Sequence, residues 1–262
     1  RRRHTRYISV TGVQTCALPI FRDIVANLPD VNGFNCIVPS SGGKDSTYIV
    51  GTLIEMGARP LVVTATTCHL TELGRANIDN LARWATTIEY SPNKKTRAKL
   101  NKLGLELVGD ISWPEHVAIN TIPFRIAKQT GIKAMFYGEN PTVEYGGPLD
   151  VHDQMQMNKR WISEFGGQLG LRPSDFEFDM SDYLFPKDAE IEAYFLGQFI
   201  PWDSRRNASV AEDMGMEFEL PHVGNWWEFE NLDNAQTGLH DYFGYLKYGY
   251  NRASVQMSVD IR

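Results

Sequence analysis

Between residue 35 and about residue 140, short apolar runs alternate with stretches that have helical periodicity. The runs that we interpret as strands are Asn35–Pro39, Leu61–Ala65, Thr87–Tyr90 and Lys133–Tyr137. The segments between them are long enough to hold crossover helices, and crossovers of that length imply parallel strands. The alternation therefore predicts an α/β fold with a doubly wound parallel sheet.

Two of the intervening segments carry clear helix signals. Lys44–Met56 is followed by Gly57, a residue that typically ends a helix. Further along, four apolar residues recur at the i, i+3, i+4, i+7 spacing of one buried helix face: Ile78, Leu81, Ala82 and Ala85. These patterns predict a helix after each of the first two strands.

The first 20 residues differ from the rest of the chain. They contain no acidic residue and no hydrophobic stretch for a signal peptide, and back-translated they resemble a sequencing adapter. We interpret residues 1–20 as non-native and expect the native N-terminus to be missing. The patterned end of the sequence leads us to expect truncation at the C-terminus as well.

We expect residues 21–148 to form the α/β domain and residues 149–262 to form an appended region. The appended region begins with a predicted helix, Val151–Phe165, and is then rich in aromatic residues, Asp and Asn. It holds too much aromatic surface for a solvated tail. We therefore expect it to pack over one end of the sheet.

Composition and charge exclude several classes of protein. The chain has 262 residues, of which 42% are hydrophobic and 22% charged, as in folded globular proteins. No apolar run approaches the roughly 20 residues needed to cross a bilayer. Without the four arginines of residues 1–20, Lys+Arg falls from 26 to 22 against 32 acidic residues, a net charge of −10. A nucleic-acid partner is therefore not expected.

Cysteine usage indicates a reducing compartment. Cys16 lies in the segment that we interpret as non-native, which leaves Cys36 and Cys68 without any C-x-x-C spacing. Two such cysteines cannot form a disulfide framework, so we expect a cytoplasmic protein.

The strongest local signal is SSGGKDS at residues 40–46, which follows the first strand and opens a helix. The two glycines let the backbone turn N–H groups toward a phosphate, and the helix N-terminus adds its positive dipole end. Because Lys44 follows the glycine pair directly, the segment is not the G-x-x-x-x-G-K-[ST] loop. It predicts an anion site, and the alternative is a Gly-rich turn with an ordinary helix cap.

In this position SGGKDS resembles the PP-loop of the ATP pyrophosphatases, which split ATP between the α and β phosphates. The resemblance implies an adenine nucleotide alpha hydrolase-like fold for residues 21–148, with ATP and Mg²⁺ as cofactors. It implies that Lys44 supplies a cation and that Asp45 either helps to place Mg²⁺ or caps the turn. The residues that would cradle the β and γ phosphates are Ser41, Gly42, Gly43 and Ser46.

Other candidates follow the predicted strands, because ligands of open α/β sheets bind outside the strands' carboxyl ends. By the same resemblance, Thr64 and Thr66 would flank the adenosine. After the last predicted strand, Gly138 allows close backbone approach, and Glu139 and Asn140 are candidates to reach Mg²⁺ or the reacting group. The alternatives are a polar strand–helix loop and a proline-bounded turn.

Longer runs narrow the resemblance. They are GDISWPEH (109–116), YGENPTVEYGG (137–147), RWISEFGG (160–167), FLGQFIPWDS (195–204) and ENLDNAQTGLHDYF (230–243). As a group they resemble the N-acetyl sugar amidotransferases of lipopolysaccharide, O-antigen and surface-glycan biosynthesis. The resemblance covers essentially all of residues 21–262.

The resemblance implies an ATP-dependent ligase that adenylates the acetamido oxygen of an N-acetyl sugar or nucleotide sugar. Ammonia then replaces AMP to give an acetamidino sugar. No Cys–His–Glu arrangement of a glutaminase is apparent, so a separate ammonia-supplying subunit is implied. Members similar to this chain carry an N-terminal segment like a zinc ribbon, so structural Zn²⁺ is expected in the missing segment.

For the acceptor sugar we expect residues of the appended region, which offer stacking and hydrogen bonds to hydroxyl groups. These are Trp202, Asn207, Glu230, Asn231, Asp233 and His240. The alternative is that the Asp and Asn side chains serve turns.

Two other functions stay open at this point. A PP-loop tRNA-thiolation enzyme would need catalytic cysteines and a basic face. A non-catalytic nucleotide-binding module would bind ATP without turnover.

Overall fold

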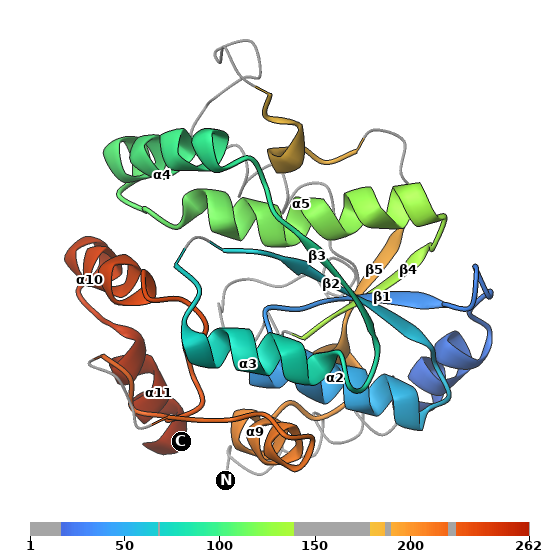
Figure 1. Cartoon of the computed structure of the whole chain (residues 1–262). Helices are drawn as coiled ribbons and strands as arrows, with labels where there is room; N and C mark the ends of the chain where they lie inside the picture. Colours follow the sequence, from blue (N-terminus) through green and yellow to red (C-terminus); the bar gives the residue numbers. More distant parts are fainter. Residues whose placement is uncertain (1–16, 68, 139–178, 187–189, 220–223, 262) are drawn as a thin grey trace, which may run out of the picture.

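The computed structural model describes residues 17–67, 69–138, 179–186, 190–219 and 224–261 (Figure 1). Its centre is an all-parallel sheet of five strands. In spatial order they are β3 (Thr86–Tyr90), β2 (Pro60–Ala65), β1 (Cys36–Pro39), β4 (Ala134–Tyr137) and β5 (Glu192–Phe195). The four predicted strands are confirmed to within one residue at each end, whereas β5 is an addition.

The order of the strands reverses its direction at β1. From β1 the chain moves outward through β2 to β3, and it then returns to place β4 on the other side of β1. In register, Ile37 of β1 lies between Leu61 of β2 and Met135 of β4. The gap between the carboxyl ends of β1 and β4 is therefore the switch point of the sheet, where open α/β folds bind ligands.

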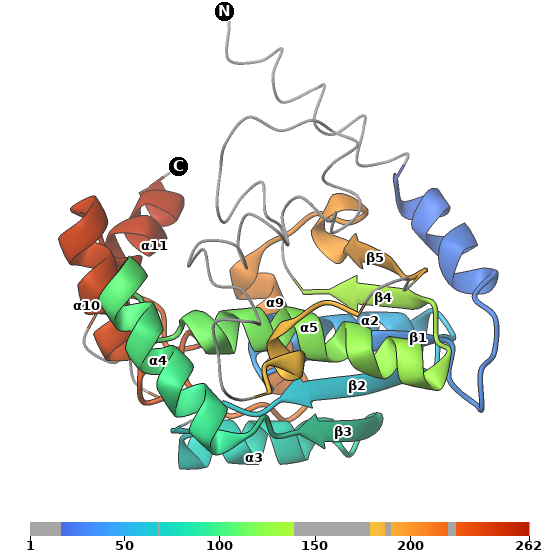
Figure 2. The ribbon, with the colours of Figure 1, turned by 90° about the horizontal axis from the view of Figure 1, so that it is seen from above.

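Helices cover both faces of the sheet, which confirms the doubly wound α/β fold (Figures 1 and 2). On one face lie α2 (Lys44–Glu55) and α3 (Glu72–Leu81), and on the other lie α5 (Trp113–Thr130) and, beside it, α4 (Lys94–Val108). Alternate strand residues face opposite sides. Ile37 is buried in the α5-side core, whereas Cys36 and Val38 are buried in the α2-side core.

Both helices that follow the first two strands end earlier than predicted, α2 by one residue, at Glu55 instead of Met56. Gly57 follows α2 with φ +84°, as expected of a residue that ends a helix. However, α3 ends at Leu81, and its C-cap is Ala82. The predicted apolar face, which reached Ala85, therefore extends one turn beyond the end of α3. The chain closes there, because the backbone N–H groups of Trp84 and Ala85 both donate to the carbonyl of Leu81.

The appended region extends the sheet instead of only packing over its end. β5 pairs with β4 along the whole of both strands. Among its described residues, the region also holds the short 3₁₀ helices η3 (Ser181–Tyr183) and η4 (Leu196–Gln198) and the helices α9 (Ser204–Asp213), α10 (Thr237–Tyr248) and α11 (Arg252–Ile261). α9 packs on α2, and Gly51 permits this approach, because a Cβ there would lie 2.6 Å from Met214 Sδ.

The structure tests neither the predicted helix in the appended region nor the interpretation of residues 1–20 as non-native. The predicted helix Val151–Phe165 lies outside the described residues. The predicted boundary at residue 20 falls within a helix at 17–26, whose Phe21 is fully buried and contacts Phe136 and Phe199. Among the described residues, no helix is long and apolar enough to span a membrane.

Candidate phosphate-binding site

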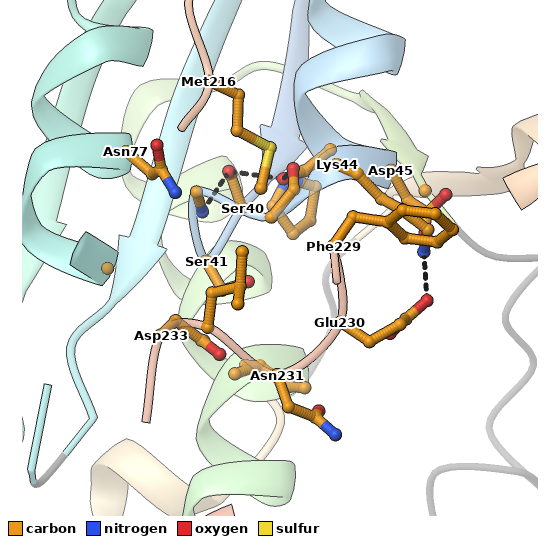
Figure 3. A pocket seen from close by; sticks show the side chains of 18 of the residues that line it. Ser40, Ser41, Lys44, Asp45, Asn77, Met216, Phe229, Glu230, Asn231 and Asp233 are labelled. Atoms are coloured by element: carbon orange, nitrogen blue, oxygen red, sulfur yellow. Dashed lines mark hydrogen bonds and ion pairs between the residues drawn. The ribbon is translucent and has the colours of Figure 1, made fainter. Parts of the chain in front are cut away.

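A pocket of about 420 Å³ lies at the switch point of the sheet (Figure 3). Its walls come from residues 39–46, from the ends of β2 and β4, and from the segment 229–233 of the appended region. A concave site of this size, where polar groups converge, is the usual form of a small-molecule site. All of the predicted PP-loop residues, Ser41 to Ser46, line it.

The loop between β1 and α2 is tightly packed and internally bonded. Gly42 has φ +86°, and a Cβ there would lie 2.9 Å from Ile78 Cγ1 and 3.0 Å from the Ile78 nitrogen of α3. The Ser40 hydroxyl accepts from the Gly42 N–H at 3.0 Å and donates to the Ser46 hydroxyl at 2.7 Å. Only glycine fits at position 42, because both φ and the neighbouring helix exclude a side chain.

The N-terminus of α2 opens into the pocket without a side-chain cap. Its N-cap is Gly43, which has no side chain to accept a bond from the first turn. The N–H groups of the next three residues have no acceptor within the helix by geometry. The hydroxyls of Ser46 and Thr47 both donate to the Gly43 carbonyl at 3.0 Å, which fixes the first turn. The turn therefore offers preorganised donors and a positive dipole end to an anion.

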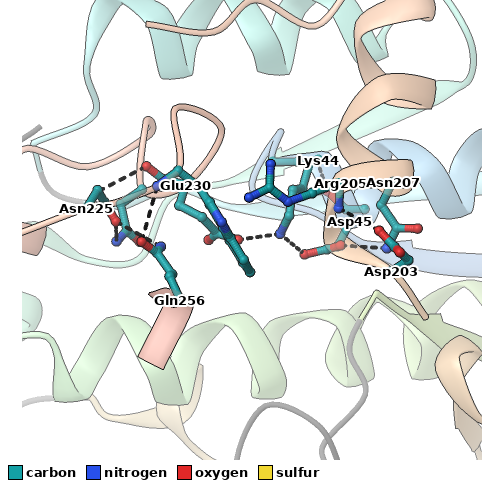
Figure 4. A network of polar contacts seen from close by, with 12 residues as sticks. Lys44, Asp45, Asp203, Arg205, Asn207, Asn225, Glu230 and Gln256 are labelled. Atoms are coloured by element: carbon teal, nitrogen blue, oxygen red, sulfur yellow. Dashed lines mark hydrogen bonds and ion pairs between the residues drawn. The ribbon is translucent and has the colours of Figure 1, made fainter. Parts of the chain in front are cut away.

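Lys44 is the buried cation of the pocket, with 5% of its side chain exposed. Its Nζ lies 2.5 Å from Asp45 Oδ2 and 2.6 Å from Glu230 Oε1, and 5.6 Å from the centre of the Phe229 ring (Figures 3 and 4). Burial disfavours the ammonium charge, but the two carboxylates outweigh it and raise the pKa of Lys44 above its ordinary value. Lys44 is therefore charged at neutral pH.

Asp45 is held in place from the opposite side by α9. The amide of Asn207 donates to Asp45 Oδ1 at 2.9 Å, and Asn207 is fully buried (Figure 4). Asp203 caps α9 by accepting from the N–H groups of Arg205 and Arg206, both at 2.9 Å. Asn207, which was expected to contact the sugar, does not line the pocket, because α9 turns its side chain inward onto Asp45; a contact with the sugar stays a prediction.

The segment 229–233 brings three predicted sugar ligands to the loop instead of to a separate surface. Glu230, Asn231 and Asp233 all line the pocket. The backbone carbonyl of Asp233 accepts from the Thr71 N–H at 3.0 Å, which ties the segment to the start of α3. Burial raises the pKa of Asp233, and a hydrogen bond with the Ser41 side chain opposes that rise.

The predicted residues of β2 do not reach the pocket. Val63 and Ala65 line it, whereas Thr64 and Thr66 do not. The cause is the alternation of strand side chains, which turns Thr64 to the face opposite that of its neighbours. Among the described residues, the buried hydroxyls of Thr64 and Thr66 have no hydrogen-bond partner.

Gly138 lies against the loop, as its position after β4 predicts. A Cβ there would lie 2.9 Å from the Asp45 carbonyl carbon and 3.0 Å from the Ser46 nitrogen. The end of β4 can therefore approach the first turn of α2 only with glycine at this position. Glu139 and Asn140 lie outside the described residues, so their catalytic and metal-binding roles stay predictions.

The remaining two predicted sugar ligands lie away from the pocket lining. Trp202 meets the Tyr48 ring edge to face, with 5.9 Å between ring centres, and packs against the α2-side core. His240 lies on α10 and contacts Asp110, with 2.8 Å between Nδ1 and Oδ1. Contacts with the α/β domain, with Tyr48 and Asp110 respectively, hold both side chains away from the pocket lining.

Several pocket residues were not predicted. Asn77 of α3 lines the pocket and exchanges two hydrogen bonds with the backbone of Glu217, at 3.0 and 2.8 Å. Gln256 of α11 accepts from the Trp226 N–H at 2.6 Å and so supports the wall that carries Glu230 (Figure 4). Phe229 and Trp227, which both line the pocket, had a signal, since they belong to the aromatic run at 226–229. Asn77 and Gln256 are single amides in helices, which no local pattern marks.

Comparison with known proteins does not show a family for this chain. No family model matches the sequence, and no curated protein matches it. Among solved structures, one described as NMN synthetase from Francisella tularensis is similar with a TM-score of 0.36 and 11% sequence identity. That match covers 91% of this chain and 94% of the other. At so low a TM-score, the description of the fold depends on the strand order and the helix layers themselves.

Proposed function

We propose that this chain binds ATP at the Ser40–Ser46 loop and uses it to adenylate the acetamido oxygen of an N-acetyl or nucleotide sugar. The observation that carries the proposal is the uncapped N-terminus of α2 at the switch point of the sheet, with Lys44 buried beside it. The resemblance of the SGGKDS loop and of the longer runs to the amidotransferases supplies the reaction class.

The pyrophosphate portion of ATP would lie on the N–H groups of residues 43–46. These donors are fixed before binding, so little ordering free energy is lost on association. Lys44 would then exchange its bond to Glu230 for one to a phosphate oxygen. The side chains of Val63 and Ala65 offer an apolar wall next to the loop for the nucleoside.

The charges in the pocket fit Mg²⁺. Three carboxyl groups, those of Asp45, Glu230 and Asp233, line the pocket, and the first two contact Lys44. Against the cations Lys44 and Arg252, the lining therefore carries an excess of acidic side chains for a polyanionic ligand. Carboxylate oxygens are the ligands that Mg²⁺ prefers, and Asp45 and Glu230 are the residues that would hold it. Mg²⁺ bound there would neutralise charge on the departing pyrophosphate.

In the proposed reaction the carbonyl oxygen of the sugar's N-acetyl group attacks the α-phosphorus of ATP and pyrophosphate leaves. Ammonia then adds at the imidate carbon, AMP departs with the former acetamido oxygen, and an acetamidino sugar remains. The loop N–H groups and Lys44 stabilise the charge that builds on pyrophosphate. Asn231, which also lines the pocket, would contact the acceptor.

Ammonia would come from a separate glutaminase subunit. Cys36 is fully buried in β1, and burial raises the pKa of its thiol to about 12. A thiol in that environment is inert as a nucleophile. The same property weighs against Cys36 as the sulfur carrier of a tRNA-thiolation enzyme.

The proposal is tested with a UDP-N-acetyl sugar labelled with oxygen-18 in its acetamido carbonyl. With ATP, Mg²⁺ and ammonium, we expect pyrophosphate, an acetamidino sugar and AMP that carries the label. Unlabelled AMP, or pyrophosphate release that needs tRNA instead of the sugar, would overturn the proposal. ATP binding without any turnover would favour the non-catalytic module.

Two lysine variants provide a matched control. Lys44 and Lys94 are each the first residue of a helix, but Lys94 is exposed and lies outside the pocket. Lys44→Ala should lower the rate of labelled AMP formation by about 100-fold or more, because it removes a cation that stabilises the leaving pyrophosphate. Lys94→Ala should leave the rate unchanged.

A further inference from the structure

We propose that Asp110, His116 and His240 form a binding site for a divalent transition-metal ion, Zn²⁺ in the first place, which clamps α10 to the α4–α5 turn. Asp110 lies in that turn, His116 in the first turn of α5, and His240 in α10. None of the three lines the phosphate pocket. The site is therefore separate from the proposed ATP chemistry.

The three side chains converge on one point. Asp110 Oδ1 lies 2.8 Å from His240 Nδ1, and Asp110 Oδ2 lies 3.4 Å from His116 Nδ1. One ligand atom from each residue lies within 4.8 Å of the others, and the two imidazole rings meet edge to face with 4.9 Å between their centres. Ligands of a tetrahedral Zn²⁺ are about 3.3 Å apart, given metal–ligand bonds of about 2.0–2.1 Å. Side-chain shifts of about 1 Å would therefore bring the three ligand atoms to tetrahedral zinc spacing.

The ligand types and their exposure suit a transition metal. Two imidazoles with one carboxylate, and a fourth position left for water, form a common zinc set, and imidazole favours Zn²⁺ over Mg²⁺ or Ca²⁺. The rings of His116 and His240 are 33% and 29% exposed, so an ion can enter from solvent.

Asp110 is fixed before any ion binds. Its Oδ1 accepts from the Ser112 N–H at 2.9 Å, which supports the ligand from a second residue. Its backbone carbonyl packs against Gly104, where a Cβ would lie 2.5 Å from that oxygen. The turn therefore presents a carboxylate of set orientation to the two histidines.

The position of α10 calls for such a clamp. Among the described residues, α10 buries none of its side chains. Figures 1 and 2 both show α10 beside α4. Among the described residues, Gln236 before α10 also donates to the Ser112 hydroxyl at 3.3 Å, and Arg252 of α11 donates two bonds of 3.0 Å to Asp241 of α10. Apolar burial alone thus accounts poorly for its placement, whereas a metal bond would fix it.

The test uses the whole chain, stripped of metal, with Zn²⁺ alone as the ligand in equilibrium dialysis and with X-ray absorption spectroscopy of the product. We expect the wild type to bind one Zn²⁺ per chain in dialysis and to lose this binding when either histidine is replaced. We expect the absorption spectrum to show nitrogen and oxygen ligands, two of them imidazoles. His116→Gln and His240→Gln should each weaken binding by at least about tenfold. His69→Asn, at an exposed histidine outside the cluster, is the matched control and should bind as the wild type.

Hydrogen exchange gives a second readout that does not depend on the variants folding. Adding Zn²⁺ to the wild type should slow amide exchange in residues 237–248. No binding of Zn²⁺ by the wild type, a sulfur-only first shell, or binding that both histidine variants retain would overturn the proposal. Each of these outcomes would leave a metal-free Asp–His network in this place.

Discussion

The two adjacent glycines of the phosphate loop should respond differently to alanine, because the fold makes different demands on them. At Gly42, φ is +86°, and an added Cβ would lie 2.9 Å from Ile78 Cγ1 and 3.0 Å from the backbone nitrogen of Ile78. At Gly43, φ is −75°, and the nearest atom to an added Cβ is Ser41 Oγ at 3.4 Å, an ordinary contact.

The magnitudes follow from these contacts. A left-handed backbone costs an L-residue about 1–2 kcal/mol, and forcing a methyl group into a packed site costs about 1–3 kcal/mol. Gly42→Ala should therefore lower the free energy of unfolding by about 2–5 kcal/mol. For Gly43→Ala, the loss at the N-cap of about 0.5–1 kcal/mol is offset by a similar reduction in unfolded-chain entropy, which leaves a change near zero.

The assay is urea unfolding of the two variants and the wild type, followed by tryptophan fluorescence and far-UV circular dichroism. Gly43→Ala should keep the wild-type midpoint but weaken ATP binding, because its methyl group would lie at the anion-binding end of α2. If the two variants lost the same free energy of unfolding, the packing of the loop against α3 would be refuted.

Three further predictions concern charge and burial at the site. Because Asp45 and Glu230 outweigh burial and raise the pKa of Lys44, its stabilising effect should be complete below its ordinary pKa of 10.5 and decline only as the pH rises further. Lys44→Met breaks a buried ion pair and should lower the free energy of unfolding by about 3–5 kcal/mol. In urea melts this difference from the wild type should stay constant from pH 7 to 10, and a steady decline over that range would contradict the raised pKa of Lys44. Asn207→Ala should cost about 1.5–3 kcal/mol in the same melts, because Asp45 loses a buried donor, and unchanged stability would mean that the Asn207–Asp45 bond is not formed. Cys36 should resist iodoacetamide at pH 8 until urea unfolds the chain, since burial raises its pKa to about 12, and peptide mass spectrometry showing rapid native alkylation would contradict a central β1.

Local pattern was enough to predict the parts of the fold that are local in origin. The four strands, the helix that ends before Gly57 and the phosphate loop each depend on residues within a few positions of one another. The alternation of strands and helices then leaves few arrangements other than a doubly wound parallel sheet. β5 is as short as β1 and β4, and it escaped prediction because it lies in a region without the alternation of strand and helix patterns that marked the other strands.

The composition of the site was decided by tertiary structure. Lys44 and Asp45 are adjacent in sequence, yet their partners Glu230 and Asn207 come from more than 160 residues away and arrive there only because α9 packs on α2 and residues 229–233 fold over the loop. Strand parity, which a shift of one residue reverses, placed Ala65 in the pocket and Thr64 outside it. The sequence by itself thus determined the sheet and its anion-binding loop, because these arise from short-range periodicity and turn chemistry. Only long-range packing decided which carboxylates and amides surround that loop.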